Sequence, residues 1–163
     1  DKNTFIFCFH YQINIIKDIT YNINNGSIDI YEGEDENQAW LVSIDNKNNS
    51  LITIYENDIL IIEGESTTNT VSIHGCGKSN QRELYLLLNS LTIHENLTKD
   101  NKNHPFNFEN INMVDIYITI NSNTNIYVHS SAFYLSDNCH NCKLILEGSI
   151  NNAFLNINSL SSD

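Results

Sequence analysis

The chain has 163 residues, 8 basic against 20 acidic, and its formal net charge of −12 excludes the basic footprint that nucleic-acid binding needs. The same acidity disfavours an anionic membrane surface, and no stretch approaches the ~20 apolar residues that span a bilayer. The length predicts one domain, residues 1–163, whose partners would be cations, neutral glycans or a basic protein surface.

Asparagine accounts for 28 residues, whereas charged residues make up only 17% of the chain. Chains rich in Ile, Asn, Ser and Thr are typical of β-solenoids, in which short coils stack and asparagine side chains form ladders between them. The composition therefore favours an all-β chain and predicts asparagine ladders along its turns.

The first segment, Phe5–Ile16, is the most apolar and aromatic stretch of the chain. A solenoid exposes unpaired strands at its ends, and terminal segments differ from the repeats because they cover those edges. We therefore interpret residues 1–16 as an N-terminal cap or as a segment that inserts into a second copy. The opening residues lack the pattern of a signal peptide, so we expect a mature form or an excised piece.

An acidic loop follows two short strands that flank the turn at Asn24–Gly26. Clustered carboxylates are ligands that calcium prefers, which makes this loop a candidate calcium site. It lacks the alternating Asp and Asn spacing of calcium loops, so a solvated turn is the other interpretation. The candidate metal ligands are Glu32, Glu34, Asp35 and Glu36.

From residue 50 onwards, short strands recur in which apolar residues alternate with Thr, Ser or Tyr, the pattern of a strand with one buried face. Self-similarity at intervals of about 20 to 26 residues indicates a stack of repeats. The strands are Leu51–Ile54, Thr70–Ile73, Ser90–Ile93 and Ile116–Ile120. We expect a right-handed parallel β-helix of about seven short coils, a single β-solenoid domain with no long helix.

The buried face of this predicted β-helix is formed by the aliphatic residues of its strands. They include Ile52, Ile54, Val71, Ile73, Leu91, Ile93, Ile116, Ile118 and Leu144. A β-sandwich remains the alternative fold, since short strands with frequent turns are also its signature.

A resemblance to a known family rests on the segment Leu60–Ile73, which reads strand, glycine, Thr-rich turn, asparagine and strand. This unit resembles that of right-handed parallel β-helix surface proteins, including carbohydrate-binding adhesin modules of bacteria and protists. Further strand and turn patterns follow in the same order up to Leu144–Ile150, so the likeness covers about residues 50–158. It implies a secreted or cell-surface module that adheres, sometimes to polysaccharide and sometimes with calcium. The chain departs from the family in having asparagine at many turns where the family has glycine.

Two histidines, His74 and His94, end strands of the same pattern and are expected at the same place in consecutive coils. With the preceding isoleucines inward, both imidazoles would point outward and stack, either binding a transition metal or forming a polar ladder. Tyr55, Tyr117 and Tyr127 are expected on outer faces, as a stacking surface for sugar rings or as ordinary strand residues.

The sharpest local motif is Cys139-His140-Asn141-Cys142. A closed zinc site needs four ligands and the chain has no second Cys-x-x-Cys pair, while a redox motif would need a thioredoxin-like context. In an oxidising compartment a Cys139–Cys142 disulfide is favoured, with free or otherwise paired thiols and a metal site as alternatives.

Three Asn-x-Ser/Thr sequons permit N-glycosylation in a eukaryotic source, although a chain so rich in these residues contains some by chance. Their asparagines are Asn25, Asn48 and Asn96.

No motif for catalysis is present, since the chain lacks a Gly-x-Ser-x-Gly elbow, a phosphate-binding glycine loop and a His-Glu-x-x-His pair. We therefore expect a non-enzymatic extracellular or cell-surface module for adhesion, with glycan as the leading ligand and a surface protein as another partner. No cofactor is expected apart from calcium. The alternative function is structural, because copies could stack end to end into a filament or coat through open solenoid edges.

Overall fold

The structure, a computed structural model, describes residues 17–33, 40–45, 51–55, 57–77, 81–97, 102–149 and 153–159. Within these ranges the chain is all-β, with 15 strands and one three-residue 3-10 helix, η1 (Ile23–Asn25). The all-β class predicted from the alternating pattern is confirmed. Within the same ranges, no helix has the length and apolar character to cross a membrane.

Seven strands form the first sheet, and all its paired neighbours are parallel. They are β1 (Asp18–Asn22), β5 (Ile59–Ser66), β7 (Arg82–His94), β11 (Val114–Ile120), β12 (Thr124–Val128), β14 (Lys143–Gly148) and β15 (Leu155–Ser159). The order β1-β5-β7-β11-β14 follows the chain, while β12 lies beside the second half of β7 and β15 lies beside β12.

Six strands form the second sheet, in the order β13-β10-β6-β2-β3-β4. They are β2 (Ile28–Glu32), β3 (Trp40–Ile44), β4 (Ile52–Ile54), β6 (Val71–His74), β10 (Phe106–Glu109) and β13 (Phe133–Leu135). The pairs from β13 to β2 are parallel, and β3 and β4 extend the sheet in antiparallel fashion.

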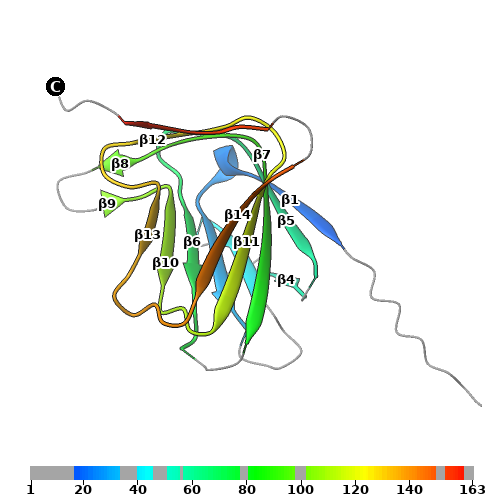
Figure 1. Cartoon of the computed structure of the whole chain (residues 1–163). Coiled ribbons are helices and arrows are strands. Elements are labelled where there is room, and N and C mark those ends of the chain that lie inside the picture. The colour runs from blue at the N-terminus through cyan, green and yellow to red at the C-terminus, as the bar shows by residue number, and fades with distance from the viewer. Residues whose placement is uncertain are drawn as a thin grey trace, which may run out of the picture.

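The chain alternates between the two sheets, and each return adds a strand beside the previous one. β2 lies between β1 and β5 in the chain, β6 between β5 and β7, and β10 between β7 and β11. An antiparallel hairpin, β8 (Asn96–Leu97) and β9 (Lys102–Asn103), interrupts one of these crossings. Figure 1 shows the result as two walls, with β5, β7, β11 and β14 on one and β6, β10 and β13 on the other.

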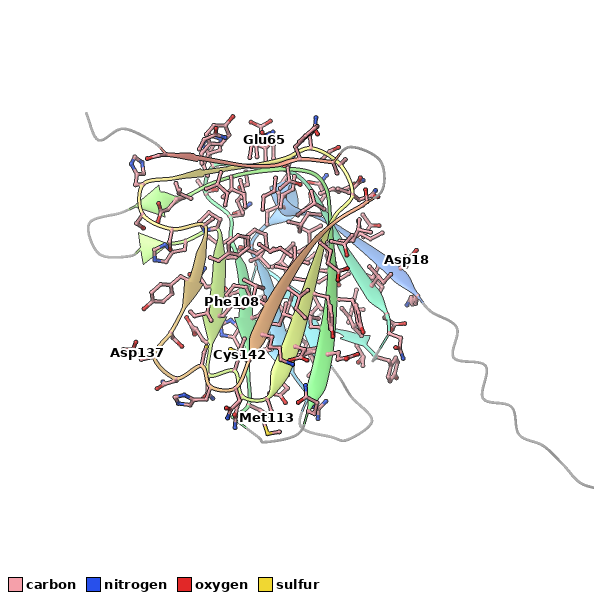
Figure 2. All side chains as sticks on the ribbon, viewed as in Figure 1. Asp18, Glu65, Phe108, Met113, Asp137 and Cys142 are labelled. Carbon is pink, nitrogen blue, oxygen red and sulfur yellow. The ribbon has the colours of Figure 1, made fainter. Side chains whose placement is uncertain are left out.

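The core lies between the walls and is formed by alternate residues of each strand. Figure 2 shows side chains filling this space, among them the buried Phe108 of β10. Seven of the nine predicted core residues are buried: Ile54, Val71, Ile73, Leu91, Ile93, Ile116 and Ile118.

Two of the predicted core residues are not buried. Ile52 is 38% exposed because β4 is the last strand of the second sheet, and Leu144 is half-buried because β14 is the last strand of the first. Both have a neighbouring strand on one side only among the described residues, so alternation alone did not reveal their exposure.

Asparagine side chains form hydrogen bonds between neighbouring strands at two places, one of them beside a bend. The Asn121 amide donates to Asn89 Oδ1 and the Asn89 amide donates to Glu63 Oε2, each at 3.3 Å. The register of β5 against β7 shifts directly after Glu63, and Ser90 takes a positive φ of 52° opposite that shift. A second rung joins Asn156 to Asn125 at 3.0 Å. Asn89 lies at the register shift, where the regular ladder of backbone hydrogen bonds is interrupted, whereas Asn125 and Asn156 are partners within the regular pairing of β12 and β15.

Candidate functional site

A pocket of about 410 Å³ opens where the chain crosses from the first sheet to the second. Figure 1 shows the elements around this crossing, the β8–β9 hairpin and β13. The residues that line the pocket come from two separate crossings. His104 lies between β9 and β10, whereas Ser130 and Ser131 lie between β12 and β13, and Tyr134 belongs to β13. Because β10 and β13 are neighbouring parallel strands, the two crossings lie side by side.

Behind the pocket, the Glu95 side chain is fully buried just after β7 and holds the two crossings together. It accepts hydrogen bonds from the backbone N–H groups of His129 and Ser130, from the Ser130 hydroxyl, and from His104 Nδ1 at 2.8 Å. Burial on its own raises the pKa of Glu95. The hydrogen bonds outweigh burial, so the pKa of this carboxyl lies below its ordinary value.

The aromatic part of the pocket is a stacked pair of rings. The His104 imidazole lies on the Tyr134 ring with centroids 4.7 Å apart and planes 18° from parallel. His104 is buried, whereas Tyr134 is 44% exposed. β13 is the last strand of its sheet within the described residues, so no strand of that sheet lies beyond Tyr134. The pocket therefore presents an aromatic ring next to two serine hydroxyls.

The residue types Ser, His and Glu invite comparison with a hydrolase triad, but the geometry differs. In a triad the carboxylate binds one imidazole nitrogen and the serine binds the other. Here Glu95, Ser130 and Ser131 all contact His104 Nδ1, at 2.8, 3.4 and 3.3 Å. These contacts fix the imidazole in place and give the serines no separate base.

The residues predicted to bind ligand do not form one site. Tyr55 is exposed after β4, Tyr117 lies on β11 and stacks on Tyr85, and Tyr127 on β12 stacks on His94. Each stacked pair joins residues at matching positions of neighbouring strands, with centroids 4.8 and 4.4 Å apart.

The expectation that His74 and His94 stack in consecutive coils is wrong. His74 lies on β6 in the second sheet, next to Tyr31 and Glu109, whereas His94 lies on β7 beside Tyr127. Their preceding isoleucines are both buried, as predicted, so both imidazoles point outward but on different faces. The same short alternating pattern occurs in both sheets, and it does not indicate which sheet a strand joins.

His74 lies between two carboxylates on the outer face of the second sheet. Its Nε2 is 3.2 Å from Asp29 Oδ1, its Nδ1 is 3.3 Å from Glu109 Oε2, and its ring stacks on Tyr31 at 4.7 Å. The hydrogen bond to Asp29 raises the pKa of His74 above its ordinary value of 6.5, with Glu109 adding to the effect and burial opposing it.

Replacing Asp29 by asparagine is expected to lower the pKa of His74, because it removes the largest cause of the raised value. A pH titration of the His74 ring followed by NMR measures this shift. Since the folded pKa is raised, stabilisation by charged His74 is present below about 6.5 and is lost as the pH rises through the folded pKa. The matched control is Asp137→Asn, at an exposed turn shown in Figure 2. An unchanged titration in the Asp29→Asn variant would contradict the assignment.

The predicted calcium loop is only partly described. Glu34, Asp35 and Glu36 lie outside the described residues. Glu32 is not a solvated loop carboxylate, because it ends β2 with its side chain fully buried, 3.1 Å from Arg82 Nε. It also accepts the backbone N–H of Cys76 at 2.9 Å. Across the described ranges, no group of three or more His, Cys, Asp or Glu side chains is arranged to hold a metal.

The predicted Cys139–Cys142 disulfide is not formed, and both residues are free cysteines. The Cys139 thiol instead donates to the Phe108 carbonyl oxygen at 3.2 Å, which directs its sulfur toward β10. Burial raises the pKa of the Cys142 thiol, with the neighbouring Cys139 adding to the effect. The pair packs against the core as small, partly buried side chains.

Of the three sequons, only one is described in full. Asn25 is exposed at the end of η1, whereas Asn48 lies outside the described residues and Asn96 belongs to β8. The predicted cap at residues 1–16 also lies outside the described residues.

The chain matches no protein family, no curated protein and no solved structure. The resemblance to β-helix surface proteins therefore stays a prediction.

Sequence reasoning missed Glu95, His104, Ser130, Ser131 and Tyr134. No motif marks them in the sequence: Glu95, His104, Ser130 and Ser131 lie in segments where the chain passes from one sheet to the other, and Tyr134 is the middle residue of β13. Recognising the pocket required knowing that β10 and β13 are neighbours.

Proposed function

We propose that this chain is a non-catalytic parallel β-helix module, extracellular or at the cell surface, that binds glycan. The observation that carries the proposal is the pocket in which the exposed Tyr134 ring lies beside the hydroxyls of Ser130 and Ser131. Sugars present apolar C–H faces that stack on aromatic rings, and hydroxyls that exchange hydrogen bonds with protein side chains. A net charge of −12 favours a neutral or cationic glycan over an anionic one.

The β-helix part of the proposal is supported by the strand pairing. Strands of the first sheet lie in chain order, are parallel, and alternate in the chain with parallel strands of the second sheet. A β-sandwich is built from antiparallel sheets, so these pairings favour the solenoid. Parallel connections of this kind are right-handed in almost all proteins. The five strands β1, β5, β7, β11 and β14 correspond to five coils in the described residues, fewer than predicted because insertions lengthen the coils.

The non-catalytic part rests on the contacts of His104. A general base must face the proton that it removes, with its ring oriented by a group on the opposite nitrogen. Glu95 and both serines share one nitrogen here, which suits a rigid wall of a binding site. The extracellular location follows from the proposed ligand and agrees with an exposed asparagine in the sequon at Asn25.

Replacing Tyr134 by alanine is expected to weaken glycan binding by about fivefold, because stacking on an aromatic ring contributes on the order of 1 kcal/mol. A glycan array with the unaltered protein identifies the ligand, and calorimetry then compares the variants. Tyr55→Ala is the matched control, since Tyr55 is also an exposed tyrosine but lies outside the pocket. Equal affinity of the Tyr134→Ala variant, or a glycan array without any binding, would contradict the proposal.

A second candidate function is assembly into a filament or coat. It is favoured by the exposed apolar side chains of the last strands, which include Leu135, Leu146 and Ile157. Such side chains on outer strands invite pairing with another chain.

A further inference from the structure

The C-terminal end of the stack is formed by three outer strands, β13, β14 and β15. Each pairs with one earlier strand and has no second partner among the described residues. Their outer edges therefore present backbone N–H and C=O groups without a neighbouring strand.

Each of these strands has one exposed inward residue, although the residue opposite it on the preceding strand belongs to the core. Leu135, Leu146 and Ile157 are opposite Phe108, Ile118 and Ile126 in the register, and all three partners are buried. The outer residues are 45%, 48% and 52% exposed. The core therefore ends in an open apolar surface at this end.

The other end of the first sheet is different. Ile19 and Tyr21 of β1 are buried, and so is Ile23 of η1. In a head-to-tail contact, the open edge at β14 would meet β1, whose apolar residues Ile19 and Tyr21 are already covered. The open surface is better matched by a copy of itself.

The sequence of β14 is self-complementary in the antiparallel direction. When Ile145 lies opposite Ile145 of a second copy, Lys143 lies opposite the second copy's Glu147, and Leu144 opposite its Leu146. Lys143, Ile145 and Glu147 share the outer side, since Ile145 is opposite the half-buried Tyr117. Two Lys–Glu pairs then form across the junction, and opposite charges directly across a strand pair are favourable.

The backbone of β14 fits the same register. Ser149 donates its N–H to the Ile120 carbonyl of β11. Because the backbone groups of successive strand residues point to alternate sides, the N–H and C=O groups of Glu147 and Ile145 also point toward β11. The groups of Leu144 and Leu146 consequently point outward. In an antiparallel pair centred on Ile145, these are the residues that exchange hydrogen bonds.

We propose that two copies of this chain form a two-fold dimer through antiparallel pairing of their β14 strands, which joins the two open cores. The charge complementarity of Lys143 and Glu147 selects a second copy as the occupant. The dimer does not depend on the glycan proposal.

Charge reversal at β14 tests the dimer, with mass measured by light scattering and sedimentation velocity. The unaltered protein is expected at twice the monomer mass of 18.6 kDa. Lys143→Glu and Glu147→Lys each place like charges across the junction and are expected to raise the dissociation constant by about tenfold or more. An equal mixture of the two variants restores both attractive pairs, so mixed dimers are expected to form.

Mixed dimers can form only if both variants are folded, so the mixture distinguishes a lost strand pairing from a folding defect. This control is needed because Lys143 also contacts Asp115 within its own chain, at 3.1 Å. The matched control is Asp18→Lys on β1 at the other end, expected to leave the dimer intact (Figure 2). An unaltered protein that stays monomeric up to about 1 mM would overturn the proposal. The protein would stay monomeric if residues 1–16 covered the open apolar surface. Single variants that dimerise normally, or mixtures that stay monomeric, would also overturn it.

Discussion

Replacing Arg82 by methionine is expected to lower the free energy of unfolding by about 3–5 kcal/mol, because it leaves the buried carboxylate of Glu32 without its cation. Arg82 is the only arginine in the chain, and its side chain is almost completely buried at the start of β7. Urea unfolding followed by the fluorescence of Trp40, the single tryptophan, measures the change.

The contact between Arg82 Nε and Glu32 Oε1 is an ion pair at 3.1 Å and not an aligned hydrogen bond. The double variant Glu32→Gln, Arg82→Met is therefore expected to recover part of the lost stability, since it removes the uncompensated charge.

Glu109→Gln is the matched control for an exposed ion pair. Glu109 contacts His74 at 3.3 Å, but its side chain is 55% exposed, so the expected loss is about 1 kcal/mol or less. If the free energy of unfolding of the Arg82→Met variant fell by no more than that of this control, the Arg82–Glu32 pair would not stabilise the contact between the two sheets.

Much of the strand content could be predicted from alternation alone. In β7, buried leucines alternate with partly exposed residues from Leu84 to Leu88, and β11 repeats the pattern from Ile116 to Ile120. The two-residue period follows from strand geometry and needs no knowledge of neighbouring strands. Hydrogen bonds between asparagines of neighbouring strands were predictable for a similar reason. An asparagine side chain carries both a donor and an acceptor, so asparagines at matching positions can bond to one another.

Which strands are equivalent could not be predicted. His74 and His94 end similar short strands, yet one belongs to the second sheet and the other to the end of a 13-residue strand of the first. The insertion of β3 and β4 after β2 and the β8–β9 hairpin change the spacing in the chain between successive strands of one sheet. The sequence period therefore indicated that short strands recur along the chain, but it did not indicate which strands are neighbours in a sheet.

The pocket was unpredictable because its residues meet only through pairing between β10 and β13. Glu95 and Ser130 are 35 residues apart, and their contact depends on the length of both crossings. The buried ion pair is similar, since Glu32 was interpreted as part of an acidic surface loop. Burial of a charged residue depends on its distant partner, and local sequence does not contain that partner.

The two proposals meet at β13. Tyr134 belongs to the pocket, while the next residue, Leu135, belongs to the open apolar surface because successive side chains of a strand point to opposite faces. A dimer through β14 would bring two pockets into one particle. Two linked sites bind a repeating surface more tightly than one site does, which suits adhesion to glycan.

Replacing Glu95 by alanine is expected to cost about 3 kcal/mol or more of folding free energy, because it leaves several buried donors without an acceptor. Glu95→Gln keeps the shape and removes the charge, and we expect a loss of about 1.5–3 kcal/mol at pH 7. Both values are measured by urea unfolding. The matched control is Glu65→Gln, an exposed glutamate on β5 labelled in Figure 2, expected to change stability by less than about 0.5 kcal/mol.

The pH dependence of the Glu95→Gln difference provides the sharper test. The folded pKa of Glu95 lies below its ordinary value of 4.5, so the stabilisation by its carboxylate is fully present above that value. It is lost as the pH falls through the lowered folded pKa, where the carboxylate becomes protonated. The difference between the unaltered protein and Glu95→Gln is therefore expected to be constant from pH 7 to about pH 5 and to shrink in more acidic solution. A difference that grows toward acid would mean that burial dominates and that the hydrogen bonds from Ser130, His129 and His104 do not hold this carboxylate.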